Sequence, residues 1–510
     1  MKTGKQKSTW KNIHKWFGLI LTVFVLIFCV SGLILNHRSL FAGCSISRNL
    51  LPAKYHIENF NNGIIKGTLP YNETQLLAFG GNGVWLTDRD CSSASDFNEG
   101  LPEGADNRNI RNIVTTSDGH ILCAAQFGLY RLNGMKWEPV TLPDNNERIS
   151  DVTLTKDSSD VVVLTRSAIY TRNGEVFQRK TLASLPEGIP EITLFKTIWQ
   201  LHSGALFGLT GRIIVDIVAT ILIFLCLTGL VLVILPPSLR KGYIHDVQKR
   251  TAVLRWNFKW HNKIGYYTII LTIILAFTGM CLRPPLMIPF VLAKSQPIPG
   301  TTLDSDNAWN DRFRAIRWDN DSDRWLLSTS EGFISVNEDF TEHPVKIPSA
   351  ATPPVSPMGI TVFEKTTPGQ WLIGSFSGLY NWNQATGKIT DYYSGQPYSP
   401  AGTGRPLSAH LISGYSGDFN SQEPVVFDYY KGAENMPEMP DILRDQPMSL
   451  WNFALELHIG RAYEPIIGPF SELFVFLSGL TLLIVLISGL VIHNRHHRRQ
   501  KQHELITNKK

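Results

Sequence analysis

Cysteine is scarce in this 510-residue chain, and its spacing excludes several classes of protein. The six cysteines form no C-x-x-C or C-x-x-C-H motif. A zinc ribbon or a covalently attached c-type haem therefore has no support in the sequence. Three cysteines lie inside apolar runs, so a disulfide is open only to Cys44, Cys91 and Cys123, one of which would stay unpaired. Cys44 with Cys91 is the pairing that we consider.

Charge is almost absent from four long apolar runs. These runs cover residues 16–36, 213–235, 264–282 and 473–492, and Asp216 is their one formally charged residue. Each run is about as long as a bilayer-spanning helix requires. The sequence therefore predicts a membrane protein with four transmembrane helices.

Acidic residues are nearly missing from three short segments, residues 1–15, 236–261 and 493–510. Together these segments hold 17 of the 48 basic residues, against only Asp246 and Glu504. Because cytoplasmic loops of membrane proteins carry an excess of Lys and Arg, we expect these segments and both termini inside the cell. The formal net charge of +5 is thus a topological signal, and no continuous basic face indicates a nucleic-acid partner.

Two long segments without such apolar runs remain, residues 38–200 and 283–456. Both contain an apolar strand, a small or Gly turn and a second strand ending in Asn, Asp or Gly, as in residues 75–90, 119–140 and 369–389. The repeats follow one another at intervals of 40 to 46 residues, which suits β-propeller blades. Neither segment has enough repeats to close a ring, so we expect one exported propeller-like domain built from both. Two independent antiparallel β domains are the alternative.

Four of the fourteen histidines recur at equivalent places in the two halves of the membrane part. His14 and His261 each stand 17 residues before a Ser-Gly or Thr-Gly pair. His202 and His458 each belong to a Leu-His-x-Gly motif, 26 and 30 residues before the next such pair. We interpret this as a duplicated two-helix unit with a histidine at the start of both helices. The topology places His14 and His261 near the cytoplasmic face, and His202 and His458 near the outer face.

A pair of histidines at each face indicates a cofactor. An ionisable group at a membrane threshold is costly unless it faces the bundle or a cofactor. Facing helices can present a neutral imidazole to each side of a flat macrocycle, so the pattern predicts two bis-histidine haems of the b type. Two histidines per face are too few for a usual zinc site, while capping of helix ends is the alternative for any single histidine. Recurring glycines should admit the ring (Gly18, Gly265, Gly204, Gly460) or allow close helix packing (Gly32, Gly229, Gly279, Gly489).

Several further residues near the ends of the apolar runs are candidates. Arginines at the outer ends could pair with haem propionates or hold an anionic chelate, although membrane-anchoring arginines look identical in sequence. Asp216 follows Arg212 by four residues, so the two could pair on one helix face. His37 and His493 could replace an assigned ligand, but neither has a counterpart in the other half, which favours an interfacial role. The arginines are Arg38, Arg212, Arg283 and Arg461, of which Arg212 and Arg283 are the cofactor-binding candidates.

The motifs W-K-N-I-H-K-W-F-G-L, L-H-S-G-x-x-F-G, W-H-N-K-I-G and L-H-I-G resemble those of the PepSY-associated transmembrane proteins of bacterial inner membranes. The resemblance covers the helices and their flanks, about a third of the chain. Members are regarded as haem b-containing reductases of ferric siderophores, linked to iron uptake. The resemblance implies that His14, His202, His261 and His458 match the family's histidines. Relatives often carry a small PepSY module in the exported part, where this sequence has blade-like repeats.

The combined prediction is a four-helix, di-haem b protein of the bacterial inner membrane with an exported all-β domain. It would pass electrons from a quinol or flavoprotein donor to a ferric siderophore or other ferric chelate in the periplasm. A one-electron relay needs no nucleophile or general base, so no catalytic residue is assigned. A non-enzymatic membrane-anchored receptor or sensor is the alternative. The predicted limits are 1–37, 201–235, 262–282 and 457–492 for the helices, 38–200 and 283–456 for the β repeats, and 236–261 and 493–510 for basic cytoplasmic segments.

Overall fold

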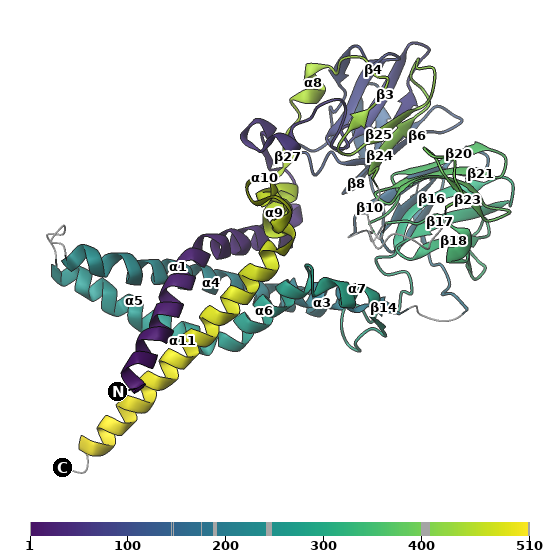
Figure 1. Cartoon of the computed structure of the whole chain (residues 1–510). Helices are drawn as coiled ribbons and strands as arrows, with labels where there is room; N and C mark the ends of the chain where they lie inside the picture. Colours follow the sequence, from purple (N-terminus) through teal and green to yellow (C-terminus); the bar gives the residue numbers. More distant parts are fainter. Residues whose placement is uncertain are drawn as a thin grey trace. The chain divides into compact units, whose positions relative to one another are not determined.

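A computed structural model of the chain divides it into two compact units (Figure 1). The helical unit comprises Met1–Ser39, Glu191–Asp304 and Trp451–Lys510, and the sheet unit comprises Leu40–Pro190 and Ser305–Leu450. The β repeats are thus confined to shorter segments than the predicted 38–200 and 283–456. The structure describes residues 2–143, 145, 147–174, 176–186, 191–240, 247–356, 358–398 and 409–507.

Three helices of the helical unit are long and apolar enough to cross a membrane. They are α1 (Lys2–Asn36), α4 (Gly208–Arg240) and α11 (Ser471–Thr507). Helix α1 packs against both of the others. Leu21 and Val25 of α1 share a buried apolar cluster with Val218 and Leu222 of α4, which is the helix-on-helix contact expected of a bundle.

The third predicted span is broken. Helix α5 (Val247–Tyr267) and helix α6 (Ile269–Cys281) are bent by 67° at Thr268. The Thr268 hydroxyl donates to the Ile264 carbonyl at 2.9 Å, a side-chain bond that competes with the helix ladder and bends helices. The single straight span over 264–282 is therefore corrected to a bent pair. The predicted basic segment 236–261 is also largely helical in its described part, because α4 runs to Arg240 and α5 begins at Val247.

His202 and His458 end short helices and do not begin the long ones, as the sequence had suggested. The short helices are α3 (Leu194–His202) and α9 (Leu450–His458). Gly204 and Gly460 follow with φ of 75° and 88°, the left-handed conformation that terminates a helix. A 3₁₀ turn then leads to the long helix in each half, and α10 (Glu464–Ile467) lies after this turn in the second half only. Its four residues account for the longer interval of 30.

The sheet unit consists mainly of small antiparallel sheets whose strands follow in chain order. Alternating apolar strands and Gly, Asn or Asp turns produce this hairpin pattern. The first three sheets are β2 (Gly67–Pro70), β3 (Gln75–Gly80), β4 (Gly83–Asp88) and β5 (Ala94–Asp96); β6 (Ile110–Thr115), β7 (Ile121–Ala125), β8 (Gly128–Asn133) and β9 (Lys136–Val140); and β10 (Ile149–Leu154), β11 (Val161–Thr165), β12 (Ile169–Asn173) and β13 (Val176–Lys180). The fourth to sixth are β16 (Phe313–Asp319), β17 (Arg324–Thr329), β18 (Gly332–Val336) and β19 (Val345–Lys346); β20 (Val362–Thr367), β21 (Gln370–Ser375), β22 (Gly378–Asn383) and β23 (Lys388–Asp391); and β24 (Ile412–Ser416), β25 (Val425–Asp428) and β26 (Gly432–Ala433).

Two-stranded ladders and short helices complete the described elements. The ladder of β1 (Ser45–Ile46) and β27 (Met448–Ser449) closes the ends of the sheet unit, and that of β14 (Ile192–Thr193) and β15 (Lys294–Ser295) belongs to the helical unit. The remaining α-helices are α2 (Arg38–Phe41), α7 (Met287–Leu292) and α8 (Asp441–Arg444).

Each of the six sheets shares a buried apolar cluster with the next, and the sixth shares one with the first. Both long exported segments therefore contribute to one continuous series of cores, since the first three sheets come from one segment and the last three from the other. Representative pairs, in order around the series, are Phe79 with Ile113, Leu122 with Val163, Leu164 with Trp325, Phe333 with Trp382, Leu372 with Ile412, and Phe427 with Trp85.

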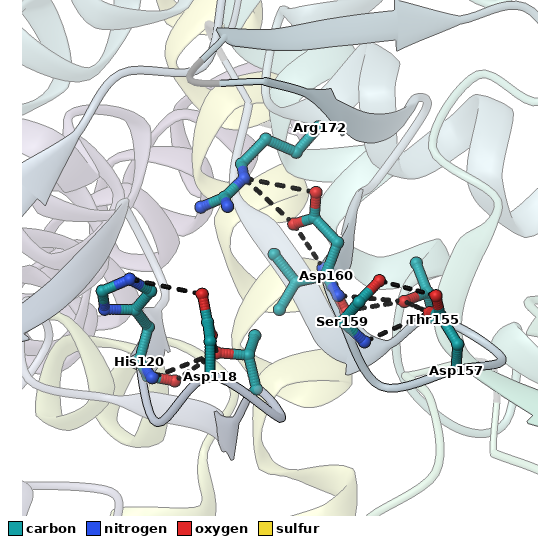
Figure 2. A network of polar contacts seen from close by, with 9 residues as sticks. Asp118, His120, Thr155, Asp157, Ser159, Asp160 and Arg172 are labelled. Atoms are coloured by element: carbon teal, nitrogen blue, oxygen red, sulfur yellow. Dashed lines mark hydrogen bonds and ion pairs between the residues drawn. The ribbon is translucent and has the colours of Figure 1, made fainter.

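The hairpin turns of the second and third sheets use the same polar residues (Figure 2). In the β6–β7 turn the Thr116 hydroxyl donates to Asp118, and in the β10–β11 turn the Thr155 hydroxyl donates to Asp157 at 2.8 Å. The Ser117 amide donates to the Ser158 carbonyl at 2.8 Å, which joins the two turns. These contacts satisfy local backbone and side-chain groups, as Asp and Ser/Thr do in turns, and they explain a structural role.

All six cysteines are free thiols. Cys91 is fully buried and Cys44 is exposed. The disulfide considered between Cys44 and Cys91 is therefore not formed.

Candidate cofactor-binding site

The four recurring histidines lie in two facing pairs within the helical unit. The ring centroids of His14 in α1 and His261 in α5 are 6.2 Å apart, with an angle of 82° between the rings. Those of His202 in α3 and His458 in α9 are 6.0 Å apart, with an angle of 51°. Each pair joins one histidine from each half of the duplicated membrane part.

Each histidine is held through its Nδ1 atom by a Ser or Thr hydroxyl and by the backbone carbonyl three residues before it. The helix that supplies these two oxygens always belongs to the other half of the duplication. The contacts are Val485 O at 3.0 Å and Ser488 Oγ at 3.2 Å for His14, Leu275 O and Thr278 Oγ1 both at 3.1 Å for His202, Phe28 O at 3.1 Å and Ser31 Oγ at 3.0 Å for His458, and Leu225 O with Thr228 Oγ1 at 2.9 Å for His261.

These contacts decide which ring nitrogen carries the proton. A carbonyl oxygen can only accept, so Nδ1 must be the donor. The hydroxyls use their own protons elsewhere, as where Ser31 donates to the Ile27 carbonyl at 2.7 Å and Thr278 to the Ile274 carbonyl at 2.8 Å. Nε2 of each neutral ring therefore keeps its lone pair, which is the state of a histidine that ligates a metal through Nε2.

The glycine after each Ser or Thr makes room for the histidine ring. A Cβ added at Gly279 would lie 2.9 Å from His202 Cε1, and one added at Gly489 would lie 3.1 Å from His14 Cε1. The corresponding distances are 3.3 Å for Gly32 to His458 and 3.5 Å for Gly229 to His261. The roles expected for the two groups of glycines are thus exchanged. Added Cβ atoms at Gly18 and Gly265 would meet Val485 and Leu225 and no ring, while Gly204 and Gly460 end α3 and α9.

The two histidine pairs are well separated along α1. This helix carries His14 of one pair and, 17 residues later, Ser31, which holds His458 of the other pair. At 1.5 Å rise per residue the separation is about 26 Å, close to the apolar thickness of a bilayer of about 30 Å.

The geometry of each pair fits two axial ligands of one metal. Imidazoles on opposite sides of an ion, with Nε2 about 2 Å from it, have ring centroids about 6 Å apart. Among the described residues no group of three or more His, Cys, Asp and Glu side chains gathers at a possible metal position. Each pair therefore offers the two ligands that an iron porphyrin takes from a protein, with its Nδ1 protons already satisfied.

The other predicted candidates lie apart from the pairs. His37 forms an ion pair with Asp216 at 2.8 Å, and Asn36 donates to the same carboxylate at 3.0 Å. Asp216 is thus held by α1 and not by Arg212, which is exposed. His493 stacks on Tyr266 with ring centroids 4.3 Å apart.

The outer arginines differ from one another. The Arg38 guanidinium lies over the Trp451 ring, 3.7 Å from its centroid. Arg461 forms an ion pair with Glu456. Arg283 follows the C-terminal end of α6, and its Nε atom is buried without a hydrogen-bond partner. Of the two cofactor-binding candidates, Arg283 therefore has an unused donor next to the His202–His458 pair, while Arg212 faces outward.

Comparison with known families accounts for most of the chain. Residues 136–493 match the family described as the PepSY-associated TM region. The chain belongs to this family. The matched range contains His202, His261 and His458 of the PepSY-associated protein, and His14 precedes it. Family membership and the apolar helices place the chain in a membrane.

Other comparisons add little to this assignment. No curated protein matches the sequence significantly. Solved structures of the extracellular domain of BT4673 from B. thetaiotaomicron, described as part of a hybrid two-component system or of a one-component system, are 12% identical with TM-scores of 0.23. The alignments cover 72% and 71% of this chain and 39% of each of those chains.

Proposed function

We propose that this PepSY-associated protein is a di-haem b electron-transfer protein of the bacterial inner membrane, which reduces a ferric siderophore or another ferric chelate in the periplasm. The observation that carries the proposal is the presence of two facing histidine pairs, at 6.2 and 6.0 Å, near opposite ends of one membrane-length helix. Haem bound between the members of each pair would supply one-electron redox chemistry.

The protein's own residues have three tasks in this proposal. His14 with His261, and His202 with His458, would bind the iron through Nε2. The Ser and Thr hydroxyls and the backbone carbonyls hold each imidazole in the neutral Nδ1–H form and orient its ring, as groups around metal-bound histidines generally do. The surrounding apolar helices exclude water from the path of the electrons.

The proposed direction of transfer is outward. Residues 1–15, 236–261 and 493–510 would be cytoplasmic by their excess of Lys and Arg, which places the His14–His261 pair on the side of a quinol or flavoprotein donor. The six sheets would be periplasmic and would form a closed six-bladed propeller, which the return of the apolar clusters from the sixth sheet to the first supports. Together with α1, α4 and α11, the bent pair α5–α6 would supply a fourth crossing.

An absorption spectrum of the purified, detergent-solubilised protein before and after dithionite tests the proposal. Two low-spin bis-histidine b-type haems per chain are expected. Alanine at His202 or His458 should remove the signal of the outer pair, and alanine at His14 or His261 that of the inner pair. His37→Ala and His493→Ala are matched controls, because these histidines also end long helices but pair with Asp216 and Tyr266.

A colourless protein from cells with ample porphyrin would contradict the proposal and favour the alternative, a membrane-anchored receptor without redox activity. Retention of both signals in all four alanine variants would contradict the ligand assignment specifically.

A further inference from the structure

The two outer ends of the membrane part have diverged after duplication. In the first half the residues between the Leu-His-x-Gly motif and the long helix begin with Ala205 and include Phe207, whereas in the second half Arg461 and Tyr463 take their places. Helix α10 follows Tyr463 and has no counterpart. The second half therefore has a guanidinium and a phenol next to His458 where the first half has apolar groups.

Two buried donors at this end lack acceptors. Arg283 Nε and Tyr463 Oη are both buried without a hydrogen-bond partner in the described part of the chain. The Tyr463 ring is fixed by Phe474 at 4.7 Å and Phe24 at 6.0 Å between centroids. An unmade hydrogen bond of a buried group is destabilising, more so for a charged one. Two such donors at one end of the unit indicate that a partner outside the chain accepts from them.

The charges around Arg283 also call for an anion. Burial lowers the pKa of Arg283, and the positive charge of Arg461 lowers it further, so the two guanidinium groups are neighbours. Glu456 is engaged with Arg461, and Glu472 influences Arg283 electrostatically without forming an ion pair with it. Two close guanidinium groups favour a bound oxyanion, because such groups match the geometry of a carboxylate.

The donors lie close to the outer histidine pair along the chain. Arg283 follows Thr278, which holds His202, by five residues, and Arg461 follows His458 by three. Arg283 and Tyr463 also both approach the first turns of α11, through Glu472 and Phe474.

We propose that Arg283, Arg461 and Tyr463 form a binding site for a carboxylate at the outer end of the helical unit. The carboxylate has two possible sources, the ferric chelate that accepts the electrons or a propionate of the haem between His202 and His458. Both sources rest on the proposed function, whereas the anion site itself does not.

Iron-free citrate tests the site directly. In full-length detergent-solubilised protein, citrate should raise the thermal unfolding temperature if the site is open to ligands from solution. Arg283→Gln and Tyr463→Phe should lose this stabilisation. Arg212→Gln, which removes an exposed arginine from the corresponding outer end of the first half, should keep it. This measurement needs no haem, so it separates failure of the site from failure of the proposed function.

Oxidation of the dithionite-reduced protein, followed by stopped flow, distinguishes the two sources. If the acceptor supplies the carboxylate, Arg283→Gln should slow oxidation by ferric citrate about tenfold, the loss expected for one charge-assisted hydrogen bond, and leave oxidation by a cationic ferric complex unchanged. If a propionate supplies it, citrate will not stabilise the protein, and Arg283→Gln will shift the outer haem's midpoint potential and slow both oxidants equally. Unchanged citrate response, haem potential and rates in both variants would overturn the proposal.

Discussion

At the scale of single residues, the hydroxyls that hold the histidines should control the properties of any metal bound to them. An acceptor on Nδ1 makes an imidazole a stronger electron donor, which favours the oxidised metal. Thr278→Val keeps the shape of the side chain but removes the oxygen 3.1 Å from His202 Nδ1, while the Leu275 carbonyl stays. Loss of one hydrogen bond of about 1 kcal/mol predicts a rise of about 40 mV in the outer haem's potential, measurable by redox titration.

Thr228→Val is the matched control for this prediction. It removes the oxygen 2.9 Å from His261 Nδ1 in the other pair, so it should shift the inner potential by a similar amount and leave the outer one unchanged. Identical shifts of both potentials in either variant would show a general effect of packing and contradict a local role of the hydroxyl.

The glycines next to the hydroxyls allow a graded test. Gly279→Ala would bring a methyl group 2.9 Å from His202 Cε1, a distance that real Cβ atoms do not tolerate, whereas Gly229→Ala would place it 3.5 Å from His261 Cε1, an ordinary contact. We expect Gly279→Ala to lose most of the outer haem and Gly229→Ala to keep the inner one. The haem-to-protein ratio measures this, and equal retention in both variants would contradict the ring positions.

At the scale of elements, the turn between β4 and β5 should make the sheet unit sensitive to acid. Partial burial alone would raise the pKa of Asp88, but hydrogen bonds from Ser92 and Ser93 outweigh it and lower the pKa to about 2. The hydroxyls of Ser92 and Ser93 lie 2.8 and 2.6 Å from the carboxylate. Because the folded-state pKa lies below the usual 3.8, this stabilisation is present above about pH 4 and is lost as the pH falls through 2.

Asp88→Asn should therefore lower the unfolding free energy by about 1 kcal/mol at neutral pH, with allowance for solvent screening. The difference from the wild type should shrink between pH 4 and pH 2 in thermal unfolding. Asp90→Asn, in the same turn, removes an exposed carboxylate that accepts none of these bonds and should behave as the wild type. A loss in Asp88→Asn that persists unchanged at pH 2 would contradict the assignment to the carboxylate.

The elements also show where a sequence pattern stops being informative. The apolar runs located α1, α4 and α11, because a span is determined by local composition. They gave no sign that Thr268 breaks the third run or that α3 and α9 are separate from the long helices, because these features depend on hydroxyl bonding and on left-handed glycines. The blade-like repeats predicted hairpins, and the structure has them as small antiparallel sheets.

At the scale of the whole molecule, the duplication explains which parts of the site a sequence could indicate. The four histidines stood out because both halves repeat them, and the structure brings them together as two pairs. The constant interval to Ser-Gly or Thr-Gly was visible, but its meaning was not. His14 is held by Ser488 and His458 by Ser31, so the hydroxyl that serves a histidine belongs to the other half and lies far away in the chain. Tyr463 was missed because it breaks the repeat.

The topology of the whole molecule can be tested with a native thiol. Cys44 is in the sheet unit and is exposed, whereas the other five cysteines are buried or half-buried. If the sheet unit is periplasmic, a membrane-impermeant maleimide added to intact spheroplasts should label the wild type and fail to label Cys44→Ser. A cysteine introduced at exposed Arg498, near the cytoplasmic end of α11, should react in the Cys44→Ser background only after the membrane is permeabilised. Labelling of Cys44 only after permeabilisation would reverse the orientation, and with it the outward direction of electron transfer that the positive charges predict.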